Sequence, residues 1–146
     1  DPDPYPELGI HNFRLALCVT TATTRQELIQ SAYDYNHPLT VLSAKPQGGS
    51  WPLSHGFITL KAGSVAISAV KVPENGTGKE MIIRLYETEG QDTQVTLGFC
   101  RDIREAVMVD LNEQPLAVLP KPEVQDTQVT FGVDAASVAS IRLLFD

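Results

Sequence analysis

Residues 94–99, Gln-Val-Thr-Leu-Gly-Phe, alternate between polar or small residues and large apolar ones. Successive side chains of an extended chain point to opposite faces, so Val95, Leu97 and Phe99 share one face of a strand. The same period of two recurs later in the chain, at Val107, Val109 and Leu111, at Val129, Phe131 and Val133, and at Ile141, Leu143 and Phe145. This repetition predicts strands with one buried face, as in antiparallel sheets.

Further strands are predicted on the N-terminal side of this region. They cover residues 11–19, 39–44, 56–60, 64–72 and 81–86. Turn residues separate several of them, and Asn75-Gly76 is the strongest such signal. About nine or ten short strands at a spacing of roughly ten residues indicate an all-β chain folded as an antiparallel β-sandwich.

Residues 11–19 carry one of the clearest of these alternations. Its apolar face is formed by Phe13, Leu15, Leu17 and Val19. Asn12 and Arg14 fall on the opposite face. The pattern predicts a half-buried strand near the beginning of the sandwich.

One short helix is predicted, at residues 24–35. Thr24 can cap its N-terminus, and Glu27 follows at the spacing of a capping box. Pro38 limits its C-terminal end, because the residue before a proline avoids helical geometry. Apolar side chains recur at helical intervals, at Leu28, Ala32 and Tyr35.

The hexapeptide Gln-Asp-Thr-Gln-Val-Thr occurs twice, at residues 91–96 and 125–130. The segments around the two copies do not match well, which argues against a solenoid of stacked repeats. We therefore expect two equivalent, edge-type strands that use the same turn.

The composition indicates one globular domain spanning residues 1–146. Apolar residues make up 42% of the chain, which is enough for a core, and no apolar run reaches the roughly 18 residues of a membrane-spanning helix. The net charge is −7 and the eleven Lys and Arg residues are scattered, so phosphate groups would not be neutralised on one face. Neither nucleic acid nor a membrane is expected as a partner.

The two cysteines, Cys18 and Cys100, lie in apolar, strand-like surroundings and are predicted to be buried free thiols. Two cysteines are too few for a disulfide framework, although spacing alone leaves a bond between them open. Their small number favours a reducing, cytoplasmic location.

No catalytic or metal centre is predicted from the residues themselves. None of His11, His37 and His55 has a second potential ligand two to four residues further along the chain. No nucleophile motif is present, and the glycine pairs fit turns rather than phosphate loops. Eighteen acidic residues would form pairs by chance, and the sequence offers no reason to select one pair for glycosidase chemistry.

Two neighbouring stretches nevertheless resemble a known family. Residues 68–75, Ser-Ala-Val-Lys-Val-Pro-Glu-Asn, lead into residues 83–90, Ile-Arg-Leu-Tyr-Glu-Thr-Glu-Gly. They are similar to the paired strands "SA-hydrophobic-K-x-x-E" and "R-L-Y-E-x-x-G" of the C-terminal β-sandwich region of glycoside hydrolase family 38 α-mannosidases. Other similar stretches follow in the family's order, at residues 9–17, 32–39, 106–113 and 138–145.

The resemblance implies a function as well as a fold. The family cleaves α-mannosidic bonds with retention, and uses a zinc-type divalent ion and an aspartate nucleophile supplied by its N-terminal part. Residues 1–146 would then be the non-catalytic C-terminal fragment of a larger glycosidase. This fragment would need no cofactor of its own, would support the catalytic domain of the same polypeptide, and would contribute to binding mannose-containing glycans.

Four charged residues of the two stretches lead to two hypotheses. Lys71, Glu74, Arg84 and Glu87 could face one another across a hairpin and form cross-strand ion pairs. Alternatively, Glu74 and Arg84 could reach the sugar pocket of the intact enzyme and bind substrate.

Two other functions remain open from the sequence. The chain could be a free-standing carbohydrate-binding module, for which Trp51, Tyr33, Tyr35 and Tyr86 are the possible stacking surfaces. It could also be a structural or adhesion β-sandwich of another kind.

Overall fold

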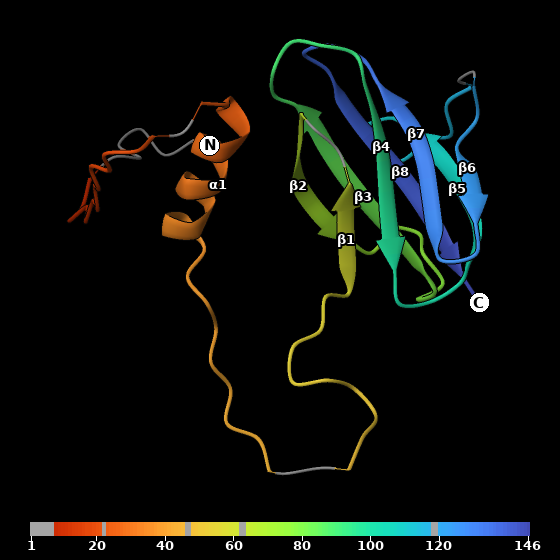
Figure 1. Cartoon of the computed structure of the whole chain (residues 1–146), viewed down its shortest axis with the longest axis horizontal. Coiled ribbons are helices and arrows are strands. Elements are labelled where there is room, and N and C mark those ends of the chain that lie inside the picture. Colours follow the sequence, from red (N-terminus) through yellow and green to blue (C-terminus); the bar gives the residue numbers. More distant parts are fainter. Residues whose placement is uncertain (1–7, 22, 46–47, 62–63, 118–119) are drawn as a thin grey trace.

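The computed structural model describes residues 8–21, 23–45, 48–61, 64–117 and 120–146. Two four-stranded antiparallel sheets pack face to face, with one helix beside them (Figure 1). The elements in chain order are α1 (Arg25–Asn36), β1 (Ile58–Lys61), β2 (Val65–Lys71), β3 (Glu80–Glu87), β4 (Thr93–Phe99), β5 (Ile103–Val109), β6 (Glu123–Gln125), β7 (Gln128–Val133) and β8 (Val138–Phe145).

One sheet has the strand order β1-β4-β7-β6 and the other β2-β3-β8-β5. Every ladder is antiparallel. The predicted all-β sandwich with one helix is confirmed. The described residues form eight strands rather than nine or ten. Two predicted segments before β1 are not strands, and the short edge strand β6 was not predicted.

The core lies between the two sheets and follows the predicted alternation in β4, β7 and β8. The predicted face of Val107, Val109 and Leu111 is wrong, because Met108 of β5 enters the core, Val107 and Val109 line the outer face, and Leu111 is exposed beyond the strand. The largest side chains that are completely buried include Ile83, Leu85, Val95, Leu97, Val129, Ile141 and Leu143. Burying a side chain of this size contributes roughly 1.5–3 kcal/mol. The hydrophobic effect on these inward faces therefore stabilises the sandwich.

The strand predictions for residues 11–19 and 39–44 are wrong for this structure. Both segments lie outside the strands, and their apolar side chains are exposed. Alternation predicts which side chains share a face, but it does not specify the strand with which a segment pairs. No described strand of the sandwich forms a ladder with either segment.

The helix prediction is confirmed together with its cap. The Thr24 hydroxyl accepts a hydrogen bond from the Glu27 backbone N–H at 3.2 Å, and the Glu27 carboxylate accepts one from the Thr24 N–H at 3.1 Å. The N–H of Thr23 donates to the same carboxylate at 2.8 Å. These bonds, first that from Thr23 and then that from Thr24, lower the pKa of Glu27.

Helix α1 docks on the edge of the sandwich through polar contacts. The Tyr33 hydroxyl lies 3.2 Å from the Tyr86 hydroxyl on β3. The Gln26 amide donates to the Val65 carbonyl at 3.2 Å, and the Gln26 backbone N–H donates to Glu89 at 3.1 Å. The docked face is therefore a different one from the Leu28, Ala32 and Tyr35 face seen in the sequence, which is exposed.

The two copies of the hexapeptide meet at their last residues, between β4 and β7. Thr96 of β4 is the direct partner of Thr130 of β7, and their hydroxyls are 2.9 Å apart. The prediction of edge-type strands is wrong, because β4 and β7 are the two central strands. The turns also differ, since Asp126 has a φ of 49° whereas the Asp92 carboxylate accepts a hydrogen bond from the Ala135 N–H.

Cys18 and Cys100 are both free and both exposed, so the prediction that they are buried is wrong. Cys18 belongs to the exposed segment before α1, and Cys100 comes directly after the end of β4. Within the described ranges, no helix combines the length and hydrophobicity needed to cross a membrane.

Candidate functional site

The two family-like stretches form the β2–β3 hairpin. Ala69 pairs with Arg84 and Lys71 pairs with Ile82, with a bulge between Ile67 and Ala69. Arg84 and Tyr86 are half-buried on the outer face, whereas Ile83 and Leu85 are completely buried in the core. The predicted assignment of these four side chains to opposite faces is confirmed.

Glu87, at the end of β3, is turned toward the backbone of two neighbouring turns. Its carboxylate accepts hydrogen bonds from the N–H groups of Glu89 at 2.7 Å, Gly90 at 2.6 Å and Ala136 at 2.9 Å. Burial acts to raise the pKa of Glu87, but the backbone hydrogen bonds outweigh it and lower the pKa to about 2. The residue therefore stabilises turns and is not the cross-strand partner of Arg84.

Lys71 and Glu74 are held by a residue that the sequence argument did not select. The Lys71 ammonium lies 2.6 Å from Oε1 of Glu113, and the Glu74 backbone N–H donates to Oε2 of Glu113 at 2.7 Å. The hydrogen bond from Lys71 is the main cause of the lowered pKa of Glu113. In the sequence, the feature that could have drawn attention to Glu113 is its position at the end of the family-like residues 106–113.

Arg84 points across the neighbouring strand instead of toward an acidic residue. Its Nε donates to the Ser140 hydroxyl on β8 at 3.0 Å. Ser140 is buried, and this bond satisfies its hydroxyl. The predicted cross-hairpin ion pairs are thus wrong, and the register leaves Arg84 and Glu74 at different levels of the hairpin.

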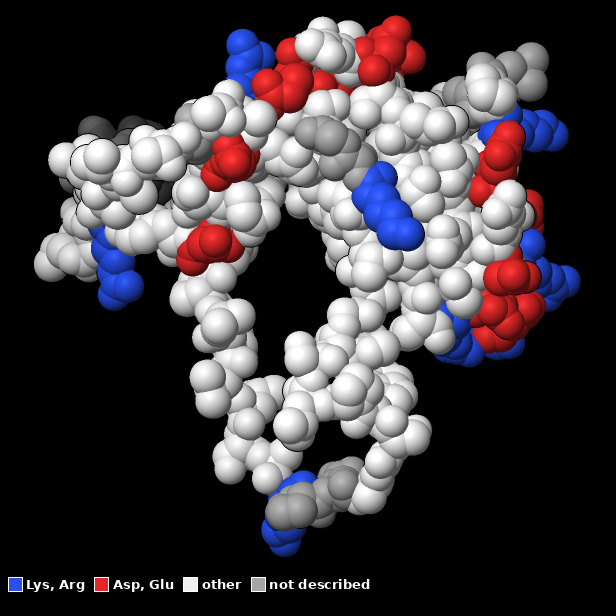
Figure 2. Space-filling view, in the orientation of Figure 1, with Lys and Arg blue, Asp and Glu red and all other residues white. Residues whose placement is uncertain are grey.

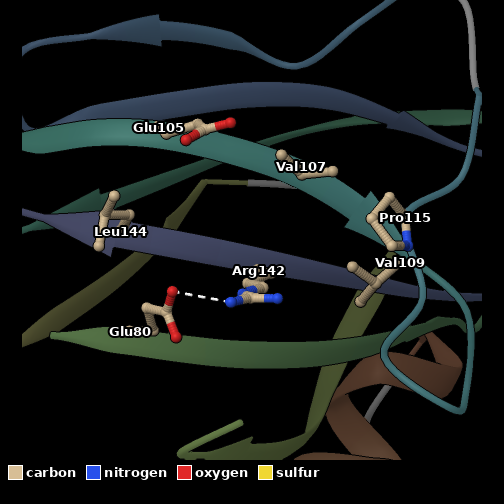
Figure 3. Close-up of a pocket in the computed structure, with 7 residues that line it drawn as sticks. All are labelled: Glu80, Glu105, Val107, Val109, Pro115, Arg142 and Leu144. Carbon is tan, nitrogen blue, oxygen red and sulfur yellow. Dashed lines mark hydrogen bonds and ion pairs between the residues drawn. The ribbon is translucent and has the colours of Figure 1, made fainter. Parts of the chain in front are cut away.

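A shallow cavity of about 240 Å³ lies on the outer face of the same sheet (Figure 3). The Arg142 guanidinium of β8 lies 2.7 Å from the Glu80 carboxylate of β3, and Glu105 of β5 completes the charged part of the lining. The hydrogen bond from Arg142 is the main cause of the lowered pKa of Glu80. The apolar walls of the cavity are formed by Val107, Val109, Pro115 and Leu144.

All the described carboxyl groups with a clearly shifted pKa have it shifted downward. The pKa is lowered for Glu27, Glu80, Glu87 and Glu113. A glycosidase general acid needs the opposite, a pKa raised toward neutrality so that the proton is available. These four carboxylates are therefore ionised hydrogen-bond acceptors that stabilise the fold.

The described residues do not fit the zinc-type ion that the family resemblance implies for a full-length enzyme. A catalytic zinc site needs three protein ligands close together. Among the residues whose positions are described, no three His, Cys, Asp or Glu side chains are grouped in this way. His37 contacts Tyr33, and His55 lies against Trp51 in a different segment.

The possible sugar-stacking residues are not brought together in one platform. Tyr33 and Tyr86 are joined by their hydroxyls between α1 and β3. Trp51 is in the segment before β1, where its ring centroid lies 4.8 Å from that of His55 and 5.2 Å from that of Phe57. Tyr35 lies on the exposed face of the helix.

The comparisons with known proteins agree with this architecture. Residues 64–141 match the family described as glycosyl hydrolases family 38 C-terminal beta sandwich domain. The chain is 28% identical over 116 residues to "Alpha-mannosidase 2C1" of Homo sapiens and 27% identical over 115 residues to that of Mus musculus. These similarities cover 78% and 77% of this chain but 11% of each relative. No solved structure gives a match.

The match to the family covers more than half of the chain and includes all of the β2–β3 hairpin. It includes strands of both sheets, from β2 to the middle of β8. The chain therefore belongs to the glycosyl hydrolase family 38 C-terminal β-sandwich domain family.

Proposed function

We propose that this chain is the non-catalytic C-terminal part of an α-mannosidase, where its sandwich supports the catalytic domain of the same polypeptide. The observation that carries this proposal is the position of Glu87. This carboxylate of the "R-L-Y-E-x-x-G" stretch binds three backbone N–H groups instead of facing an open cavity. The signature of the hairpin therefore maintains the shape of the sandwich.

The electrostatics of the other carboxylates support the same function. Retaining hydrolysis needs one carboxyl group with a raised pKa and a second that acts as nucleophile. The lowered pKa values of Glu80 and Glu113 favour a role in structural ion pairs over a role as general acid. The metal-dependent chemistry of the family would then belong to the remaining part of the α-mannosidase polypeptide.

We further propose that Glu74 and Arg84 contribute one wall of the sugar pocket in the intact enzyme. Glu74 is exposed, and its backbone N–H, not its carboxylate, makes the contact with Glu113. Arg84 is half-buried and uses Nε for Ser140, which leaves its terminal N–H groups available to sugar hydroxyls. Mannose-containing glycans are the ligands that this position would serve.

Two alanine variants of the intact polypeptide test the sugar-binding role. Glu74→Ala is expected to raise KM for an aryl α-mannoside without lowering Tm by more than about 2 °C. Arg84→Ala is expected to raise KM as well, and also to lower Tm because it removes the hydrogen bond to buried Ser140. Glu123→Ala and Arg104→Ala are matched controls, because both residues are exposed on the same sandwich. A lowered Tm with unchanged KM would assign Glu74 and Arg84 to structure instead.

Activity of the separate chain tests the non-catalytic role. The purified 146-residue chain is expected to leave an aryl α-mannoside intact in the presence of zinc or cobalt, whereas the full polypeptide hydrolyses it. Hydrolysis by the separate chain would refute the proposal. We also propose a reducing, cytoplasmic location, in keeping with the two free thiols, which fluorescence microscopy of the tagged protein can test.

A further inference from the structure

A cleft of about 400 Å³ lies between helix α1 and strand β2. Figure 1 shows the helix beside β2, which is an edge strand of its sheet. The size falls in the range of about 300–1,000 Å³ that small-molecule sites occupy. The cleft is distinct from the cavity around Arg142, because the two have no lining residue in common.

The helical wall of the cleft is a row of polar and aromatic residues. Gln30, Tyr33 and Asp34 are three and four residues apart, so they share one face of α1. His37, the residue after the end of the helix, extends the same row. A helix face that packs against a sheet is usually apolar, so packing against β2 does not explain this composition.

The groups on this wall are mainly hydrogen-bond acceptors. The Gln30 amide donates to Oδ1 of Asp34 at 2.8 Å, which leaves the second carboxylate oxygen for a ligand. Nδ1 of His37 lies 3.3 Å from the Tyr33 carbonyl oxygen. Because a carbonyl oxygen can only accept, Nδ1 carries the hydrogen in this contact, and Nε2 of the neutral ring is an acceptor.

The sheet wall supplies an apolar floor and one hydroxyl group. Ile67, Ala69 and Val70 line the cleft with aliphatic surface, and Val70 is 48% exposed. The Ser68 hydroxyl donates to the Arg84 carbonyl at 3.3 Å, so its lone pairs can accept from a ligand. An apolar floor with a few well-placed polar groups is the usual composition of a small-molecule site.

The charge of the cleft limits the class of ligand. Asp34 is the one acidic residue in the lining, and no Lys or Arg is among the described residues that form it. In Figure 2, acidic side chains on α1 border an uncharged surface that leads toward the strands. A phosphate or carboxylate ligand would be repelled by Asp34 without a compensating cation. A zinc-type ion would need a third ligand, and the described part of the chain holds no such group of His, Cys, Asp or Glu.

A second cavity, of about 210 Å³, adjoins this cleft along the helix. It shares Gln30, Tyr33 and Ile67 with the first cavity, and its lining adds Ile29 and Leu60. The two cavities therefore form one groove, of which the second part is more apolar. A ligand longer than one ring has room to continue there.

We propose that this groove is a non-catalytic carbohydrate site that binds one hexose of a mannose-containing glycan between α1 and β2. The Asp34 carboxylate and the Gln30 amide bind two adjacent hydroxyls, and Nε2 of His37 and the Ser68 hydroxyl accept from others. The CH groups of the sugar ring lie on the aliphatic floor of β2. The choice of mannose rests on the proposed function, whereas the fit to a neutral polyol rests on the groove itself.

Hydrogen–deuterium exchange on the intact α-mannosidase polypeptide tests the site locally. The probe is the methyl thioglycoside of α-mannose, because its sulfur linkage resists hydrolysis. The amides of α1 are expected to exchange about tenfold more slowly when the probe is present at about ten times its Kd. Exchange of α1 that stays unchanged up to the solubility limit of the probe would overturn the proposal.

A conservative substitution in the groove tests the hydrogen bonds. Asp34→Asn keeps the size of the side chain and an acceptor for Gln30, but removes the charge and the second acceptor. It is expected to weaken binding at α1 at least about tenfold. Asp102→Asn is the matched control, because Asp102 is exposed and lies outside the groove, and it should leave Kd within about twofold. Equal binding in both variants would contradict the proposed contacts.

A second probe separates a sugar site from a site for a cationic side chain. The n-butylammonium ion resembles the end of a lysine side chain and also donates to acceptors. The thiomannoside is expected to protect α1 at concentrations at which n-butylammonium does not. Protection by n-butylammonium alone would overturn the proposal.

The exchange experiment and the α-mannosidase assay can fail independently. Protection of α1 by the thiomannoside in a polypeptide without α-mannosidase activity would preserve the groove and refute the proposed function. Activity without any protection of α1 would refute the groove and leave the proposed function standing.

Discussion

The carboxylate of Glu87 accepts a hydrogen bond from the backbone N–H of Ala136 at 2.9 Å. This contact ties the end of β3 to the turn that precedes β8. Ala136 has a φ of 51°, in the left-handed region that non-glycine residues rarely occupy. The same carboxylate oxygen binds the N–H of Gly90, whose φ is 76°, so one side chain stabilises two turns with unusual backbone geometry.

We expect Glu87→Gln to lower the stability of the sandwich. The amide keeps the size of the side chain but replaces one acceptor oxygen with an NH₂ group, which would face backbone N–H donors. Tm measured by circular dichroism should fall by several degrees. Glu123→Gln is the control, because Glu123 is exposed at the sheet edge, and it should leave Tm within about 1 °C.

The stability of the sandwich should also depend on pH through Glu87. Its pKa is about 2 in the folded protein, against an ordinary value of 4.5, so the folded state favours the ionised form. The resulting stabilisation is fully present above pH 4.5 and is lost as the pH falls toward 2. Urea unfolding between pH 7 and pH 2 should show a steeper loss in the wild type than in Glu87→Gln, and equal slopes would contradict this assignment.

Leu85→Ala should be among the most damaging single changes in the hairpin. Leu85 is completely buried between the sheets, and truncation leaves a cavity that closely packed neighbours cannot fill. The free energy of unfolding should fall by about 2–5 kcal/mol. Leu111→Ala is the matched control, since Leu111 is 68% exposed, and it should change the free energy by less than about 0.5 kcal/mol. Similar losses in both variants would be inconsistent with the described core.

Tyr33→Phe should loosen the docking of α1 and change the titration of Tyr86. The hydrogen bond with Tyr33 is the main cause that raises the pKa of Tyr86 to about 12, with burial second. Removing the Tyr33 hydroxyl should lower the pKa of Tyr86, as measured by ultraviolet titration, and cost about 1 kcal/mol of stability. Tyr35→Phe should have neither effect, because Tyr35 lies on the other face of the helix. An unchanged titration of Tyr86 in Tyr33→Phe would refute the contact.

Local patterns were reliable where the partner of a residue lies nearby in the chain. The capping box of Thr24 and Glu27 was predicted and confirmed, because all of its atoms come from one helical turn. The faces of Arg84 and Leu85 were also predicted, because strand geometry alone decides them. The side-chain partners of the hairpin were not predicted, since Glu113 and Ser140 come from other strands or turns.

The sequence by itself determined the class of the fold and the buried faces of β4, β7 and β8, because a period of two depends only on backbone geometry and on hydrophobic burial. Only the tertiary structure decided that residues 11–19 lie outside the sandwich and that Glu87 binds the turn at Ala136. The reason is that pairing and hydrogen bonding depend on which distant segments meet. The pattern of apolar residues along the chain does not specify which distant segments pair with one another.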